Sequence, residues 1–191
     1  MSRQCTHTKL SALSLLAFVV LYGCSPTPGG PEYMSKIRNV KNGLHVVHQL
    51  DDFVFDVQGQ PSELVWTQRH GSFDAGLFEN EKSDLDQIFY CTLNINARID
   101  GKGVIQHIAK DDKAQIKALS YYFSYRFQDN VYVTANGVKW PCVLYHYEQY
   151  GKQTFVLGFE KPKDIEKEVI LHIDSDILSD KPIEIKVSTR L

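Results

Sequence analysis

The chain has 191 residues and a formal net charge of −2, with 43% hydrophobic and 23% charged residues. This hydrophobic content is ordinary for a globular protein and excludes disorder along the whole chain. It has no long run of Lys and Arg, so nucleic acid is not expected as a partner, because phosphate binding needs clustered cations.

The first 23 residues have the layout of a secretory signal peptide. Residues 1–9 carry Arg3 and Lys9 without an acid, residues 10–22 are almost wholly apolar, and the small residue Gly23 follows. That order is typical of an export signal. As a helix, the apolar run would span only about 20 Å, less than the ~30 Å hydrocarbon core of a bilayer. We therefore expect residues 1–23 to be removed rather than to remain as a transmembrane helix.

The end of this segment resembles the lipobox of bacterial lipoproteins. In Leu21-Tyr22-Gly23-Cys24, an aliphatic residue stands three places before the cysteine and a small residue just before it. Tyr22 departs from the pattern, which usually has a small residue there. The resemblance implies cleavage before Cys24 and lipid on its sulfur. The protein would then be held on a membrane of the cell envelope, and Ser25 implies the outer membrane if the cell has two.

The remaining chain divides into a tether and one domain. Residues 24–43 begin with a Pro- and Gly-rich stretch, which predicts a flexible tether. Basic residues follow at Lys36, Arg38 and Lys41; they are interpreted as a solvated lead-in, or alternatively as a contact with anionic lipid headgroups. Residues 44–191 are predicted to form a single globular domain rich in β-strands.

Short apolar or alternating runs dominate this domain and predict about ten strands. The eleven candidate runs, of which 104–109 is a candidate return strand, are residues 44–50, 53–57, 63–68, 87–99, 104–109, 120–127, 131–135, 138–149, 153–160, 168–174 and 182–188. Asn136-Gly137 predicts a type I′ hairpin turn, and Pro141 predicts an irregular or edge strand. Residues 69–86 are interpreted as a polar loop. Residues 110–119 are the one helix candidate, with Asp111 or Asp112 as its cap.

These elements favour an antiparallel β-sandwich, immunoglobulin-like or similar, with at most one short helix. The alternative is a small β-barrel. In residues 87–99, alternation places Phe89, Cys91, Leu93, Ile95, Ala97 and Ile99 on one face. Residues 120–127 also alternate, and their aromatic residues are interpreted as one buried face of a strand. These are Tyr121, Phe123, Tyr125 and Phe127.

Two cysteines remain after the signal and Cys24 are set aside. Cys91 and Cys142 lie in separate predicted strands, and in an oxidising envelope they could form a disulfide, which would stabilise the fold by roughly 4 kcal/mol. The alternative is a pair of buried thiols that act as small core residues.

Aromatic residues supply the candidate ligand-binding set. Flat rings stack on sugars or peptides, and tyrosine hydroxyls add hydrogen bonds. The candidates are Tyr122, Tyr132, Trp140, Tyr145 and Tyr147.

Signatures of catalysis or metal binding are lacking in the sequence. His45 and His48 would face opposite sides of a strand, and Asp174-Ser175-Asp176 has no glycine or later glutamate to complete a calcium loop. No Gly-x-Ser-x-Gly motif occurs. We therefore expect no cofactor and no metal. The sequence favours a non-catalytic binding or structural module for another envelope protein. The alternative is a glycan-binding module. The third hypothesis is a hydrolase whose lid is formed by residues 69–86.

Overall fold

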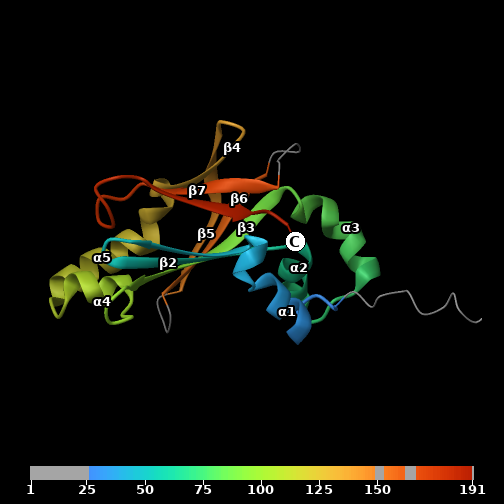
Figure 1. The fold of residues 1–191 in the computed structure, drawn as a ribbon, viewed down its shortest axis with the longest axis horizontal. Helices are drawn as coiled ribbons and strands as arrows, with labels where there is room; N and C mark the ends of the chain where they lie inside the picture. The colour runs from blue at the N-terminus through green and yellow to red at the C-terminus, as the bar shows by residue number, and fades with distance from the viewer. Residues whose placement is uncertain (1–25, 149–152, 162–166, 191) are drawn as a thin grey trace, which may run out of the picture.

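The computed structural model describes residues 26–148, 153–161 and 167–190. Its frame is an eight-stranded antiparallel sheet with the order β1-β2-β3-β6-β5-β4-β7-β8 (Figure 1). The strands are β1 (His45–Leu50), β2 (Phe53–Gln60), β3 (Ile88–Ala97), β4 (Val131–Ala135), β5 (Val138–Glu148), β6 (Thr154–Glu160), β7 (Glu168–Ile173) and β8 (Ile183–Ser188). Cys24 and the predicted signal lie outside the described residues.

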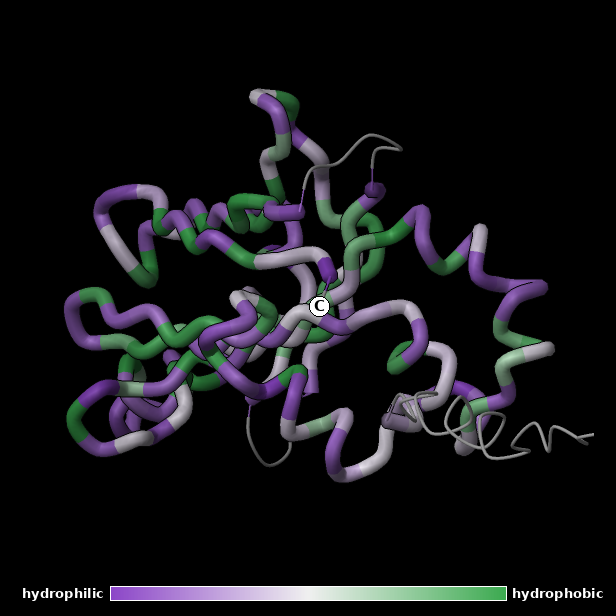
Figure 2. The backbone as a smooth tube through the Cα atoms, turned by 45° about the vertical axis from the view of Figure 1, so that its right-hand side comes forward, coloured by the Kyte–Doolittle hydropathy of each residue, from purple (hydrophilic) through white to green (hydrophobic). Residues whose placement is uncertain are grey.

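The sheet curls until it is nearly barrel-shaped. Its two edge strands, β1 and β8, approach each other at one end, where the Ser188 N–H donates to the Gly43 carbonyl at 2.9 Å. Buried residues alternate with less buried ones along β2, β3, β4 and β8. The hydropathy colour of the backbone tube changes many times along the chain (Figure 2). The inner face is therefore a continuous apolar core, with Phe55, Leu93, Phe155 and Leu171 all fully buried.

Helices lie at two ends of this sheet (Figure 1). At one end, α4 (Val104–Ala109) and α5 (Lys113–Tyr125) pack on the inner core together with the short 3-10 helix η2 (Phe127–Asn130). At the other end lie α1 (Pro31–Ile37), the 3-10 helix η1 (Val40–Asn42), α2 (Ser62–His70) and α3 (Ala75–Leu85). Helices α2 and α3 bury Trp66 and Phe78 against Tyr90, on the outer face of β3.

The prediction of a β-sandwich with at most one short helix is wrong, because the described residues contain five α-helices. Residues 63–68 belong to α2, which begins after Pro61 and ends at Gly71 in the left-handed conformation. The supposed loop 69–86 contains α3, whose first turn is capped by the Asp74 side chain. Residues 104–109 form α4 rather than a returning strand.

The aromatic run 120–127 is also helical, and its alternation is misleading for a geometric reason. Residues four apart share a face in a helix as well as in a strand. Leu119 and Phe123 are therefore buried on one side of α5, whereas Tyr121 and Tyr125 are 61% and 68% exposed on another. The predicted buried strand face with both tyrosines does not exist.

Most of the predicted strands are confirmed. In β3, Phe89, Cys91, Leu93, Ile95 and Ala97 are buried as predicted, although Ile99 lies beyond the strand and is exposed. Asn136 and Gly137 both have positive φ, and β4 pairs with β5 across them. The register of β5 shifts after Cys142, next to Pro141. Asp112 caps α5 by accepting from the Ala114 and Gln115 amides.

The folded part of the chain begins earlier than residue 44. Helix α1 buries Tyr33 and Ile37 against Leu44 and Leu64. Residues 33–43, which were expected to be a solvated lead-in, are thus packed on the domain. Lys36, Arg38 and Lys41 are nevertheless exposed, as that interpretation required.

Candidate functional site

A cavity that we call the chamber lies where α1, α2, α3 and the ends of the four strands β2, β3, β6 and β8 meet. Its volume is about 690 Å³, within the range usual for small-molecule sites. Six separate parts of the chain form its wall. The lining residues are Pro26, Thr27, Pro28, Tyr33, Gln60, Pro61, Ser62, Glu63, Phe73, Lys82, Asp86, Ile88, Phe89, Lys161, Thr189 and Arg190.

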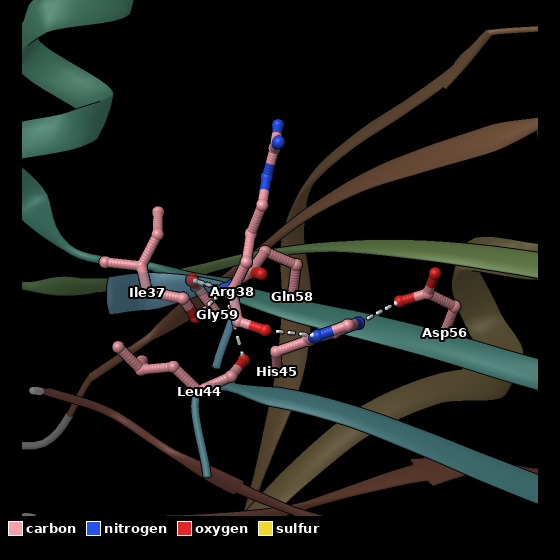
Figure 3. Close-up of polar contacts among 7 residues, drawn as sticks. All are labelled: Ile37, Arg38, Leu44, His45, Asp56, Gln58 and Gly59. Atoms are coloured by element: carbon pink, nitrogen blue, oxygen red, sulfur yellow. Dashed lines mark hydrogen bonds and ion pairs between the residues drawn. The ribbon is translucent and has the colours of Figure 1, made fainter. Parts of the chain in front are cut away.

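A polar clamp on β2 holds the α1 side of the chamber in place (Figure 3). The Gln58 Nε2 group lies 3.1 Å from the Ile37 carbonyl, which ends α1, and 2.9 Å from the Gly59 carbonyl. The Gly59 N–H donates to the Leu44 carbonyl at 2.7 Å. These contacts attach both ends of the segment 37–44 to one strand, so Tyr33 on α1 keeps a fixed position against the chamber.

His45 extends the same clamp on the outer face of the sheet (Figure 3). Its Nδ1 lies 2.8 Å from the Arg38 carbonyl and its Nε2 lies 2.9 Å from Asp56 Oδ1. A carbonyl and a carboxylate both accept hydrogen bonds, so a ring protonated on both nitrogens satisfies the two contacts together. His45 thus connects the Arg38 carbonyl, at the end of α1, to Asp56 on β2.

The opposite wall is fixed by Asp86, at the C-terminal end of α3. It accepts from Lys82 and from the Ser62 hydroxyl, and so connects α3 to the first turn of α2. Burial acts to raise the pKa of Asp86, but the hydrogen bonds from Lys82 and Ser62 and the charges of Lys82 and Lys161 outweigh it and lower the pKa. The hydrogen bond to Asp86 in turn raises the pKa of Lys82. Both side chains are therefore charged and paired with each other.

Tyr33 is the unusual side chain of the chamber. It is only 6% exposed, and its buried hydroxyl has no hydrogen-bond partner among the described residues. Leaving such a group unpaired costs about 1–3 kcal/mol. Burial, followed by the negative charge of Glu63, raises the pKa of Tyr33, so the hydroxyl keeps its proton and remains a donor.

Two further cations of the chamber are not in an ion pair with any described residue. Within the described part of the chain, neither Lys161 nor Arg190 forms an ion pair, whereas Lys82 is paired with Asp86. Glu63 is the remaining carboxylate of the lining and likewise forms no ion pair there. Helix α2 starts at the chamber with Pro61 as its N-cap, and no side chain caps its first amides. The unpaired charge of the lining is therefore net positive.

The aromatic residues predicted to stack on a ligand do not form one platform. Tyr122, Trp140, Tyr145 and Tyr147 are partly buried and pack against the inner core. The Tyr122 hydroxyl bonds Ser175 Oγ at 2.7 Å, and the Tyr147 ring stacks on Phe155 with 4.8 Å between centroids. Tyr132 lies on the outer face of the sheet, stacked on His172 at 4.6 Å. The set is divided between two faces, and none of it lines the chamber.

His172 lies at the centre of a polar cluster on that outer face. Its Nε2 is 2.8 Å from Thr134 Oγ1, and its Nδ1 is 3.6 Å from Glu184 Oε1. Burial, assisted by the charge of Lys139, lowers the pKa of His172 against the opposing effect of Glu184. The order hydroxyl, imidazole, carboxylate resembles that of a nucleophilic triad. However, the distance to Glu184 exceeds that of a hydrogen bond, and the residues line neither the chamber nor a second cavity of about 220 Å³ beside α2.

The two core cysteines are free thiols in the structure. Cys91 is opposite Leu157 and Cys142 is opposite Phe159, so strand β6 lies between them. Two strand spacings, together with an offset of two residues along β6, keep their Cα atoms more than about 9.5 Å apart, beyond the span of a disulfide. Burial raises the pKa of Cys91, and it raises the pKa of Cys142 to about 11. The arrangement matches the alternative of buried, unreactive thiols.

We therefore expect Cys91 and Cys142 to react as two free thiols once the protein is unfolded. The measurement is a thiol titration with Ellman's reagent on denatured, unreduced protein that carries Cys24 in lipid-modified form. In the folded protein both thiols should react slowly, because they are buried. A denatured protein without these two reactive thiols would show that a bridge forms after all.

Among residues 26–148, 153–161 and 167–190, no group of three or more His, Cys, Asp or Glu side chains is placed to hold a metal ion. The helices in these ranges are all too short or too polar to cross a membrane. A scan against models of protein families finds no match, and searches of curated proteins and of solved structures find no similar protein.

The chamber itself was missed by sequence reasoning. Its lining comes from segments as distant as Pro26 and Arg190, and no short motif connects them. One signal was present: Pro61 before and Gly71 after an apolar run are start and stop signals of a helix. Reading them would have placed Ser62 and Glu63 at a helix N-terminus, although not at a cavity.

Proposed function

We propose that this protein is a lipid-anchored lipoprotein of the cell envelope whose domain is a non-catalytic binding module, with the chamber as its binding site. The observation that carries the proposal is the position of the chamber. Pro26, Thr27 and Pro28 form part of its wall, and they follow directly after Cys24-Ser25. The site with the size and polarity of a ligand-binding cavity thus adjoins the predicted point of lipid attachment.

The composition of the chamber supports binding rather than catalysis. The described residues of its lining include no histidine or cysteine, and its Lys82 and Asp86 neutralise each other. Among the described residues, Lys161 and Arg190 form no ion pair, and they offer positive charge to a ligand. Apolar surface from Phe73, Phe89 and the prolines completes a site of the mixed kind that binds small molecules or the end of a larger partner.

The anchor is tested by replacing Cys24 with Ala in the full chain. The wild-type protein is expected in the membrane fraction, resistant to high salt and released by detergent, because two or three acyl chains hold a protein stably. The variant is expected in the soluble fraction or, if the signal stays uncut, in the membrane at the mass of the unprocessed precursor. Fractionation with mass spectrometry of the N-terminus gives both readouts.

Cys5→Ala is the matched control, since Cys5 lies in the segment that cleavage removes. It should leave fractionation and the mature mass unchanged. A Cys24→Ala variant that is processed, still carries the mass of the lipid and stays in the membrane would contradict lipid attachment at this residue.

A further inference from the structure

We propose that the outer edge of β1 is a second binding surface, which takes an extended segment of a partner protein as an additional β-strand. This edge shares no residue with the lining of the chamber, and its use does not depend on the lipid anchor. The direction of its free backbone groups, the composition of the strand and the charges at its end each support the proposal.

Two hydrogen bonds at the start of β1 fix the direction in which its backbone groups point. The Leu44 carbonyl accepts from the Gly59 N–H of β2, whereas the Gly43 carbonyl accepts from the Ser188 N–H of β8. Successive residues of an antiparallel strand direct their N–H and C=O groups to opposite sides, and the register between β1 and β2 has no shift. The residues whose backbone groups point away from β2 are therefore His45, Val47 and Gln49.

The outer edge is unpaired because β8 diverges from it. Beyond the Ser188–Gly43 contact, no ladder joins β1 to β8 in the part of the chain that the structure describes. In Figure 1, the β1–β2 hairpin and the β7–β8 loop lie apart at the left, although the two edge strands meet near the C-terminus. Val47 is 47% exposed, and Gln49 is exposed as well. The outward N–H and C=O groups can therefore pair with a further strand.

The composition of β1 leaves this edge unprotected. Proteins usually block the pairing of a free edge with a lysine, a proline or a β-bulge, and β1 contains none of these. Its side chains Val46 and Leu50 pack against the core but are only partly buried. An added strand would cover them further if its own apolar side chains alternate and face the same side.

An extended polypeptide is the occupant that fits these groups. Donors and acceptors at the spacing of a strand are matched by the backbone of another strand, as in peptides that add to open sheet edges. In the turn after β1, Asp51 and Asp52 are exposed and form no ion pair with any described residue. We therefore expect a partner segment with alternating apolar residues and with a Lys or Arg at the end that lies beside this turn.

The binding test uses the full chain in uncharged detergent and a fluorescein-labelled peptide, Lys-Val-Thr-Val-Thr-Val-Lys, followed by fluorescence anisotropy. Two further peptides carry N-methyl groups, one on its valines and the other on its threonines. Valines and threonines direct their N–H groups to opposite sides of the strand. We expect saturable binding of the unmethylated peptide and at least about ten-fold weaker binding of only one methylated form. Equal binding of all three peptides, or no binding of the unmethylated one, would refute strand addition.

Proline at two neighbouring positions of β1 tests the direction of the backbone groups. Val47→Pro removes an N–H that points to the free edge, where proline is tolerated. This variant should keep the urea midpoint of the wild type and bind the peptide about ten-fold more weakly. His48→Pro removes an N–H that points to β2, so it should unfold at a clearly lower urea concentration. Val47→Thr keeps the N–H and is the matched control, expected to bind as the wild type does.

The opposite results identify which part of the proposal is wrong. If Val47→Pro were as unstable as His48→Pro, the assignment of the free edge would be wrong. If Val47→Pro bound the peptide as tightly as the wild type, the peptide would bind elsewhere and the proposal would fail. Light scattering tests for a second copy: a dimer of the wild type that Val47→Pro makes monomeric would show that the edge pairs with itself, not with a partner. None of these results depends on the fractionation of Cys24→Ala, so the anchor and the edge are tested separately.

Discussion

Replacing Phe155 with Ala is expected to lower the free energy of unfolding by about 3–5 kcal/mol. Phe155 is fully buried near the start of β6. Its ring lies 4.9 Å from that of Phe127 and 5.7 Å from that of Phe123, and it stacks on Tyr147 at 4.8 Å. Truncation would leave a cavity between the sheet and α5, because these rings come from four different elements and cannot all move inwards.

Urea unfolding followed by circular dichroism measures this loss, with an unchanged m-value as the sign that the native fold is kept. Tyr125→Ala is the matched aromatic truncation. Tyr125 is 68% exposed on α5, and alanine is the better helix former, so its effect should stay within about 0.5 kcal/mol. Similar losses in the two variants would show that α5 does not pack through the Phe123 face.

Strands were predictable from the sequence where one face alone is apolar. In β3 and β8, apolar residues at every second position identify both the strand and its buried side. This holds because only the inner face of the curled sheet is buried in the core. The hairpin at Asn136-Gly137 was predictable for another local reason, since both residues tolerate the positive φ that its turn requires. Such features depend on neighbours in the sequence and need no knowledge of the rest of the fold.

Helices were missed where two periods give the same pattern over a short run. Tyr121, Phe123, Tyr125 and Phe127 alternate like a strand, but pairs four apart also match a helix. Whether this run forms a helix or a strand depends on packing in the core. There Phe123 contacts Phe155, which lies on a strand far along the chain. In α2, Leu64, Val65 and Trp66 are consecutive and all buried, because α2 lies between α1, α3 and the outer face of β3. A strand buried on both faces would show the same run.

The chamber could not be predicted, because it depends on how distant segments come together. In the sequence, Tyr33 is one more apolar residue before a basic segment. Only the structure shows that its hydroxyl is buried and has no hydrogen-bond partner among the described residues. Lys161 and Arg190 are unremarkable cations until the fold places them in one lining. The anchor, in contrast, is a prediction of local sequence alone, and it falls outside the described residues.

Replacing Gly59 with Val is expected to lower the free energy of unfolding by about 1–3 kcal/mol, although valine ordinarily favours strands. Gly59 lies where β2, the segment before β1 and the end of β8 approach each other. A Cβ atom added there would be 3.0 Å from Leu44 Cδ2 and 3.2 Å from the Ser188 carbonyl oxygen. The two methyl groups of valine would force β8 away from residues 43–44 and break the Ser188–Gly43 hydrogen bond. Urea unfolding gives the stability, and faster amide exchange at Ser188 would locate the opening.

Gly76→Ala separates this steric effect from a general intolerance of glycine substitution. Gly76 lies in α3, where an added Cβ would meet only Asp74 Oδ1, at 3.4 Å. Alanine also restricts the unfolded chain, so this variant should be more stable than the wild type by about 0.4–1 kcal/mol. The two substitutions change the free energy of unfolding in opposite directions because the two positions differ in space. Neighbouring side-chain and backbone atoms surround Gly59, whereas Gly76 has room for a Cβ atom. If Gly59→Val were as stable as the wild type, β1 and β8 could not be as close as the nearly closed sheet requires.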